Sequence, residues 1–325
     1  MSSQSRLHTA LEDGLLSLPV GPVHVMRPTL DYDLAALGDR TITFDHTFFP
    51  LVEGFRNAGY EYAQLEESGA TTAIVVVPRD KELARDMIAR AAEASSLIVV
   101  DGQKTDGVES LFKSARKALG PLTSITKAHG RLFWMTAGDE FIGWRADAPS
   151  TRAHGFVTAV GVFSADRIDP GSELLANALP KKLPSHIADL GAGWGFLSSA
   201  ILERDGVASL DLIEADRLAL DCAEQNITDA RARFLWADAT DHIAERKYDG
   251  IVMNPPFHAG RASDAGLGRD FIEAAARLLT PSGQLWMVAN RHLPYEARLR
   301  ERFRKIEELP GSGAFKLFHA SRPTR

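Results

Sequence analysis

The stretch that most constrains this chain is residues 248–258, which read Tyr-Asp-Gly-Ile-Val-Met-Asn-Pro-Pro-Phe-His. Residues 251–253 predict a short buried strand, and the strand must end at Pro255 because proline has no N–H group to donate to a neighbouring strand. Two consecutive prolines also restrict the backbone dihedrals. The loop therefore holds the Asn254 carboxamide and the Phe257 ring rigidly at the carboxyl end of the strand.

Such a loop could simply close a strand, or it could present these two groups to a planar ligand. The carboxamide oxygen of Asn254 and a nearby backbone carbonyl are hydrogen-bond acceptors, which an exocyclic amino group on a planar ring requires. Phe257 offers an aromatic face on which that ring can stack, as extruded bases do. The residues upstream favour the second interpretation.

A glycine-rich turn precedes this loop in the chain. Residues 187–190 predict a strand, residues 191–195 read Gly-Ala-Gly-Trp-Gly, and residues 196–203 predict a helix. Glycines in a strand–turn–helix unit let backbone amides approach a bound nucleotide closely. Gly191 and Gly193 are therefore candidate contacts to a nucleotide-type cofactor.

Acidic residues follow the next two predicted strands. Glu214 comes directly after the strand expected over residues 209–213, about 20 residues past the glycines, where a carboxylate can accept both hydroxyls of a ribose. Asp238 follows the strand expected over residues 233–236, where a carboxylate can meet an adenine amino group. Ligands of open α/β sheets bind at the carboxyl ends of the strands, so we expect these carboxylates to lie near Asn254.

A dehydrogenase would share the glycine turn and the acidic residue, but it would not need Asn-Pro-Pro-Phe. We find no constellation of histidine and lysine suited to hydride transfer. His258 is the only histidine next to the loop, and we interpret it as a packing or hydrogen-bonding residue rather than a base.

Composition sets broader bounds. A chain of 325 residues is long enough for about two domains, and Cys222, its single cysteine, excludes an internal disulfide and fits a reducing compartment. No apolar run reaches the length of a membrane span, so we expect a cytosolic protein. The net charge of −6 argues against a general nucleic-acid coat protein, yet residues 285–325 carry nine Lys or Arg against four Glu. That basic segment allows phosphate contact at one face of the molecule.

The first half of the chain also alternates strands and helices, which predicts a parallel α/β sheet. We expect helices over residues 7–18, 81–94 and 108–119, strands over 73–77 and 97–100, and a closing β-hairpin from 131–135 and 141–145. The junction between the two halves is expected near residues 149–152. This divides the chain into domains of residues 1–150 and 151–325.

The motifs of the second half resemble those of class I S-adenosylmethionine-dependent methyltransferases. These motifs are Asp-Leu-Gly-Ala-Gly-Trp-Gly at 189–195, Glu214, Asp238 and Asn-Pro-Pro-Phe-His at 254–258. Gly-Val-Phe-Ser at 161–164, Asp-Pro-Gly-Ser at 169–172 and Val-Ala-Asn-Arg-His-Leu-Pro-Tyr at 288–295 narrow the resemblance to the bacterial ribosomal RNA guanine-N2 methyltransferases. We identify the chain as similar to the enzymes for 16S RNA, with those for 23S RNA as relatives.

The resemblance implies a cofactor, S-adenosyl-L-methionine, and a set of site residues, with no metal. It implies cofactor contacts at Asp189, Gly191, Gly193, Glu214, Asp238 and Asn254, and a catalytic loop of Asn254, Pro255, Pro256 and Phe257. In this loop the Asn254 oxygen and the Pro255 carbonyl would hold the two protons of the guanine amino group. Phe257 would stack on a base swung out of its helix.

The two halves also resemble each other. Residues 73–79 align with residues 250–256, so that Val77 falls where Asn254 stands, and residues 27–33 contain no glycine. We therefore expect two tandem Rossmann-like methyltransferase domains in an α/β fold, of which the first is degenerate and lacks the cofactor loop and the second is catalytic. Two unrelated α/β domains with convergent patterning are the alternative.

Other functions stay open at this point. The chain could methylate guanine N2 in 23S RNA, adenine N6 in DNA or a protein glutamine, or it could be a non-enzymatic RNA-binding assembly factor with a fossil site. We expect ribosomal RNA or a ribosomal subunit as the partner, and no membrane. The sequence leaves the oligomeric state open, and we take a monomer as the working expectation.

Overall fold

The computed structural model describes residues 5–324 except residues 137, 257, 260, 261 and 264. The chain divides into two compact units, Met1–Ala148 and Pro149–Arg325. Residues 149–152, where the junction was expected, lie at the start of the second unit. Each unit has its own sheet.

Both sheets have seven strands, and the strands follow the same order. In the first unit the order is β3-β2-β1-β4-β5-β7-β6, and in the second it is β12-β11-β10-β13-β16-β18-β17. Renumbered within each unit, both orders read 3-2-1-4-5-7-6. In each unit six strands run in one direction, and the remaining strand, β7 in the first unit and β18 in the second, is antiparallel to both of its neighbours. The predicted α/β fold with two tandem methyltransferase-like domains is confirmed.

The elements of the first unit begin with a capped helix, because the Ser5 hydroxyl accepts a hydrogen bond from the His8 amide. Its helices are α1 (Arg6–Glu12), α2 (Phe49–Asn57), α3 (Lys81–Ala94) and α4 (Val108–Leu119), with 3-10 turns η1 (Leu34–Leu37), η2 (Leu65–Glu67), η3 (Lys104–Asp106) and η4 (Asp139–Trp144). Its strands are β1 (Val23–Met26), β2 (Ile42–Asp45), β3 (Glu61–Tyr62), β4 (Thr72–Val76), β5 (Leu97–Gln103), β6 (Ser124–Lys127) and β7 (Gly130–Thr136).

The second unit contains a helix before its first sheet strand, α5, which begins at Pro170 with Asp169 as its N-cap. Its helices are α5 (Pro170–Ala178), α6 (Phe196–Leu202), α7 (Arg217–Asn226), α8 (Ala265–Leu278) and α9 (Glu296–Arg302). Its sheet strands are β10 (His186–Leu190), β11 (Ser209–Glu214), β12 (Ala232–Trp236), β13 (Tyr248–Met253), β16 (Leu279–Asn290), β17 (Phe303–Leu309) and β18 (Phe315–Pro323). Two short antiparallel pairs complete the unit, β8 (Ser150–Ala153) with β9 (Phe156–Thr158) and β14 (His258–Ala259) with β15 (Ala262–Ser263).

Some predicted elements are wrong. The hairpin of residues 131–135 and 141–145 does not form, because β7 pairs with β5 and β6 and residues 139–144 form η4. Phe141 and Trp144, three residues apart, turn to one side of η4 and their rings lie 4.8 Å apart. The first helix ends at Glu12 rather than at residue 18.

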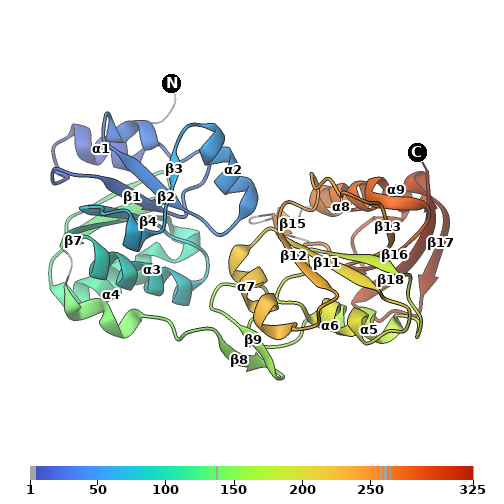
Figure 1. The fold of residues 1–325 in the computed structure, drawn as a ribbon. Helices are drawn as coiled ribbons and strands as arrows, with labels where there is room; N and C mark the ends of the chain where they lie inside the picture. Colours follow the sequence, from blue (N-terminus) through green and yellow to red (C-terminus); the bar gives the residue numbers. More distant parts are fainter. Residues whose placement is uncertain (1–4, 137, 257, 260–261, 264, 325) are drawn as a thin grey trace. The chain divides into compact units, whose positions relative to one another are not determined.

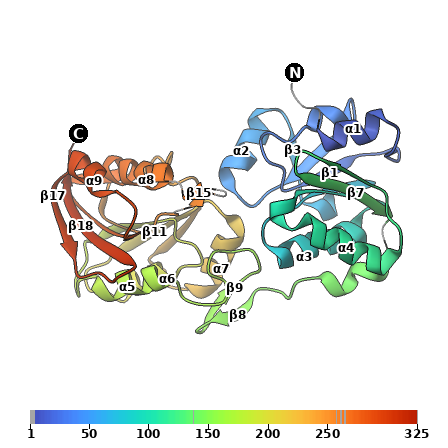
Figure 2. The same cartoon turned by 180° about the vertical axis from the view of Figure 1, so that it is seen from behind.

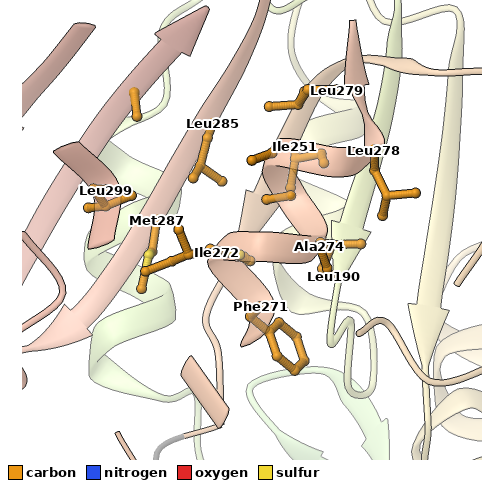
Figure 3. Packing of buried hydrophobic residues seen from close by; sticks show 14 of the residues in the cluster. Leu190, Ile251, Phe271, Ile272, Ala274, Leu278, Leu279, Leu285, Met287 and Leu299 are labelled. Carbon is orange, nitrogen blue, oxygen red and sulfur yellow. The ribbon is translucent and has the colours of Figure 1, made fainter. Parts of the chain in front are cut away.

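The core of the second unit lies on both faces of its sheet. Helices α8 and α9 cover one face, and α5, α6 and α7 cover the other (Figure 1). Figure 3 shows Ile272 of α8 beside Met287 of β16, with Leu285 and Leu299 in the same cluster. Ile272 is fully buried, so its truncation to alanine would cost about 2–5 kcal/mol of stability. This packing fixes α8 beneath the glycine turn, where Phe271 lies 3.4 Å from the position that a Cβ on Gly191 would take.

The sheet of the first unit is covered in the same way. Helices α3 and α4 lie on one face and α1 and α2 on the other, as Figure 2 shows from behind. On the second face Phe55 of α2 packs on Phe44 of β2, with ring centroids 5.0 Å apart. Among the described residues, no helix is both long and apolar enough to cross a membrane.

Candidate active site

The ends of three adjacent strands bring the expected site residues to one edge of the second sheet. Leu190 of β10 pairs with Ile213 of β11 on one side and with Met253 of β13 on the other. The next residue along each of these strands is therefore Gly191, Glu214 or Asn254. The sheet register alone places the glycine turn, the acidic residue and the carboxamide side by side.

The glycine turn has a backbone that only glycine adopts readily. Gly191, Gly193 and Gly195 all have positive φ, of 72°, 56° and 93°. A Cβ on Gly195 would lie 2.9 Å from the Ile227 side chain at the end of α7, so a larger residue there would require that side chain to shift. A Cβ on Gly193 would meet nothing within 4 Å, so the backbone there faces open space in which a ligand can approach it.

Glu214 closes the turn from the side of β11. Its Oε2 accepts a hydrogen bond from the Gly193 amide at 2.8 Å, and its Oε1 accepts one from the Asp216 amide at 2.8 Å. Burial raises the pKa of Glu214, while these backbone amides lower it. The carboxylate is thus held in place from both sides, at the position expected for a ribose contact.

Asp189 lies one residue before the end of β10 and is fully buried. Its Oδ2 accepts a hydrogen bond from the Ser198 hydroxyl at 2.7 Å, whereas its Oδ1 has no partner among the described residues. Burial raises the pKa of Asp189 to about 7, the Ser198 hydrogen bond opposes this, and the nearby Glu214 adds to it. A buried carboxylate oxygen without a partner is costly, and a cationic donor would satisfy it.

Asp238 follows β12 and caps the loop that comes after it. Its Oδ1 accepts hydrogen bonds from the amide and the hydroxyl of Thr240, at 2.8 and 2.7 Å. This arrangement fixes the carboxylate next to the end of β11, since Glu214 pairs with Trp236.

Asn254 is held in one orientation. Its Nδ2 donates to Asp169 Oδ2 at 3.0 Å and to Ser172 Oγ at 2.8 Å. An ionised carboxylate can only accept hydrogen bonds, so the amide nitrogen must face Asp169. Both amide protons are then used, and the side-chain oxygen is left as an acceptor.

The partner of Asn254 comes from α5. Asp169 caps that helix through a hydrogen bond from the Ser172 amide to Oδ2 at 2.8 Å, and Pro170 occupies the first turn. The sequence did not predict the contact of Asp169 with Asn254. The Asp-Pro-Gly-Ser motif was the only signal for it, because cap and amide are 85 residues apart.

A second tether fixes residues 157–163 on the glycine turn. Trp194 donates from Nε1 to the Phe163 carbonyl at 2.9 Å. The Asn226 side chain donates to the carbonyls of Trp194 and Val157, both at 2.8 Å. Sequence analysis missed Asn226. These bonds hold Phe163, whose side chain is 58% exposed, at the mouth of the site.

A cavity joins these parts. It is lined by Phe163, Ser164, Asp169, Ser172, Gly191, Ala192, Gly193, Trp194, Phe196, Leu197 and Asn254. The structure therefore brings Gly191, Gly193 and Asn254 to one cavity. The carboxylates of Asp189, Glu214 and Asp238 lie around the turn, at the ends of their strands, and do not line this cavity.

The remaining loop residues are only partly described. Pro255 is buried and Pro256 is exposed. Phe257 lies outside the described residues, as do the details of the His258 side chain, so stacking by Phe257 stays a prediction.

Comparison with known proteins agrees with this geometry. The model of the methyltransferase small domain matches residues 153–319. The ribosomal RNA small subunit methyltransferase C of Hahella chejuensis is 32% identical over 254 residues, which cover 74% of this chain and 73% of that protein. Its counterpart in Shewanella sp. (strain MR-4) is 31% identical over 261 residues, 76% of each chain.

One solved structure covers both units. The T. thermophilus 16S rRNA N2 G1207 methyltransferase, in complex with AdoMet and guanosine, superposes with a TM-score of 0.81 at 25% identity. The match covers 98% of this chain and 92% of that one. The likeness thus includes the first unit as well as the second.

Proposed function

Because this chain belongs to the family of the ribosomal RNA small subunit methyltransferase C, with a methyltransferase small domain as its second unit, we propose that it methylates 16S ribosomal RNA. The methyl group comes from S-adenosylmethionine and is transferred to the exocyclic N2 amino group of a guanine. The names of the sequence relatives support 16S over 23S RNA. The guanosine in the T. thermophilus complex supports guanine over adenine or glutamine.

The observation that carries this proposal is the fixed amide of Asn254. With both protons of its Nδ2 donated to Asp169 and Ser172, its oxygen is the group available to a ligand. An amino group on a planar base needs an acceptor of this kind. A site built to bind a ligand oxygen would instead need the amide nitrogen to be free.

The residues of the glycine turn fit the cofactor. The unpartnered Asp189 Oδ1 can receive a cationic donor such as an ammonium group. The open backbone at Gly193 permits close approach, and Glu214 lies where a ribose would be bound. We propose these residues, with Gly191 and Asp238, as the cofactor contacts. When bound, the cofactor supplies a methyl group activated by a sulfonium.

The chain's own residues then have to position the acceptor. The amino nitrogen of guanine is a weak nucleophile, because its lone pair is delocalised into the ring. Hydrogen bonds from its two protons to the Asn254 oxygen and to the Pro255 carbonyl would favour a tetrahedral nitrogen, whose lone pair can form the new bond to the methyl carbon as the C–S bond breaks. The proton leaves the nitrogen afterwards to solvent, so no strong base is required at the site.

The substrate is proposed in more detail by analogy. The guanine is the position numbered 1207 in the T. thermophilus relative. Base extrusion costs a few kcal/mol, which favours an RNA loop or a partly assembled small subunit over a continuous helix. We propose that the protein acts on either form as a monomer.

The experiment is a transfer assay with labelled S-adenosylmethionine. Purified protein is incubated with 16S RNA, 23S RNA or small subunits, and the digested RNA is analysed by mass spectrometry. We expect N2-methylguanosine at one position of 16S RNA. Label in adenosine, or in 23S RNA alone, would contradict the proposal.

A further inference from the structure

A large cavity of about 700 Å³ lies in the second unit, away from the site described above. Lys247, which lines it, comes directly before β13, whereas Asn254 comes directly after that strand. A strand of six residues spans about 20 Å. The cavity is therefore at the opposite edge of the sheet from the glycine turn.

The floor of this cavity is apolar and its walls are cationic. Ala274 of α8 and Leu279 of β16 form part of the floor and belong to the buried core. The walls carry five cationic side chains, Lys247, Arg277, Arg302, Arg304 and Arg322, against one carboxylate, Glu273. Three of the five come from the basic segment 285–325.

The carboxylate is already neutralised. Glu273 Oε1 lies 2.5 Å from Arg298 Nε, and Oε2 lies 3.3 Å from Arg302 Nε. Lys247, Arg277, Arg304 and Arg322 therefore have no carboxylate partner among the residues that the structure describes.

Carbonyl oxygens, rather than carboxylates, orient two of these cations. Arg277 donates from Nη1 to the His242 carbonyl at 2.6 Å and from Nη2 to the Thr240 carbonyl at 2.7 Å. Lys247 donates to the Arg277 carbonyl. These bonds fix the side chains in place without removing their net charge, which is the arrangement that a phosphate needs.

The last two arginines lie opposite each other on paired strands. Phe303 pairs with Pro323 and Lys305 pairs with Ser321, so Arg304 of β17 stands across from Arg322 of β18. Both are exposed, and neither has an ion pair among the residues that the structure describes. Like charges directly across two strands destabilise the pair, and a bound anion would reverse that effect.

We propose that this cavity binds phosphate groups of the RNA backbone, and this inference rests on the proposed function. Its volume exceeds what one phosphate fills, and its cations line several walls, which suits a stretch of phosphodiester chain. The contact would anchor the RNA at the edge of the sheet opposite the methyl-transfer site. It would add affinity without sequence information, since phosphate contacts position and base contacts specify.

The test compares two double variants that remove the same charge. Arg304→Ala/Arg322→Ala removes two cavity cations. Arg300→Ala/Lys305→Ala removes two exposed cations from α9 and β17 that do not line the cavity. Binding to 16S RNA is measured by filter binding over a series of salt concentrations, and S-adenosylmethionine binding by calorimetry serves as the check that each variant is folded.

The variant Arg304→Ala/Arg322→Ala, called the cavity variant, is expected to bind 16S RNA about tenfold more weakly. The magnitude of its slope of log affinity against log salt concentration should be smaller than in the wild type by about 1.4–1.8. The control should keep the wild-type slope, and both should bind the cofactor normally. The KM for RNA should rise in the cavity variant while kcat stays unchanged. Equal slopes for the two variants would overturn the inference.

Two further arms separate the possible failures. If inorganic phosphate binds the wild type and not the cavity variant, while the RNA slopes agree, the cavity binds free anions and the inference is wrong. If the wild type transfers no methyl group to 16S RNA, the proposed function fails instead. If the cavity variant loses cofactor binding through misfolding, the single variants Arg304→Ala and Arg322→Ala are measured, each with an expected slope change of about 0.7–0.9.

Discussion

The two units of this chain share a strand order and differ at the ends of their central strands. In the second unit the residue after β10 is Gly191, with φ of 72°, and its amide donates to the Ile213 carbonyl at 2.9 Å. In the first unit the residue after β1 is Arg27, with φ of 53°, and its amide donates to the Asp45 carbonyl at 2.9 Å. The same left-handed turn with the same hydrogen bond thus occurs with glycine in one unit and arginine in the other.

The acidic position shows the same relation. Glu214 accepts a hydrogen bond from the amide two residues ahead, that of Asp216, at 2.8 Å. His46 of the first unit accepts one through Nδ1 from the amide of Phe48, also two residues ahead, at 2.9 Å. Burial, and secondly the charge of Arg27, lowers the pKa of His46 to about 3, so this ring is neutral where Glu214 carries a carboxyl group.

These pairs favour duplication over convergence. A shared strand order can arise twice independently. A left-handed backbone at an arginine, however, costs about 1–2 kcal/mol, so this turn is not expected to arise with arginine in an unrelated domain. Its presence is understandable if the turn once carried glycine. At the ends of the same three strands the second unit has Gly191, Glu214 and Asn254 and the first has Arg27, His46 and Val76, because Met26 pairs with Val75 as Leu190 pairs with Met253. The sequence alignment of Val77 with Asn254 was therefore wrong by one residue.

The largest effect is expected at Asn254. Asn254→Ala should lower the rate of methyl transfer by about 10²–10³-fold, because one preorganised hydrogen-bonding group is lost from the reacting centre. Cofactor affinity should stay near the wild-type value in calorimetry. The matched control is Val76→Ala at the equivalent strand end of the first unit, a half-buried position where the substitution should leave the transfer rate unchanged. Undiminished transfer by Asn254→Ala would refute the role of the amide.

The second effect concerns stability against pH. The folded-state pKa of Asp189 is raised to about 7 by burial, so the folded protein holds a proton that the unfolded chain has released above about pH 4. Its free energy of unfolding should therefore fall as pH rises from about 4 to about 7, by about 2 kcal/mol between pH 5 and 8. Urea unfolding of the cofactor-free protein should show this fall, and Asp189→Asn should flatten it. Parallel curves for the two proteins would count against the buried carboxyl group.

The third effect tests the partner of the amide. Asp169→Ala removes one acceptor of the Asn254 Nδ2 protons, frees the amide to rotate and should reduce kcat about tenfold with little change in cofactor affinity. A helix-cap loss alone would cost about 1 kcal/mol of stability and leave kcat intact. Asp169→Asn, which can still accept through its oxygen, should recover part of the rate. A kcat equal to wild type in Asp169→Ala would show that the cap is its only role.

The smallest effect is expected at Arg27. Arg27→Gly relieves the left-handed strain but loses the hydrogen bond to the Thr47 hydroxyl at 2.7 Å. We expect the free energy of unfolding to change by less than about 1 kcal/mol, and the pKa of His46 to rise because a neighbouring cation is gone. Thermal unfolding and NMR titration of the His46 ring measure the two quantities. A lower His46 pKa in the variant would contradict the electrostatic contact.

The sequence predicted the parts of the site that the sheet alone determines. A strand precedes each of the glycine turn, Glu214 and Asn254. Because parallel strands end at the same edge of a sheet, the strand pattern alone predicts that these residues lie close together. The Asp169 contact could not be predicted, because it depends on how α5 packs against the sheet. The hairpin expected from residues 131–135 and 141–145 was wrong for a similar reason. Residues 141–145 have a strand-like sequence, and only tertiary packing, which buries Phe141 in a 3-10 turn, decides against a strand.

Of the two equivalent strand-end turns, we expect only the one at Gly191 to bind the cofactor, and titration calorimetry with S-adenosylmethionine measures this. We expect one site per chain in the wild type and in Arg27→Gly, and none in Gly191→Arg, which gives the second unit the residue of the first. Two sites in the wild type, or retained binding in Gly191→Arg, would contradict it.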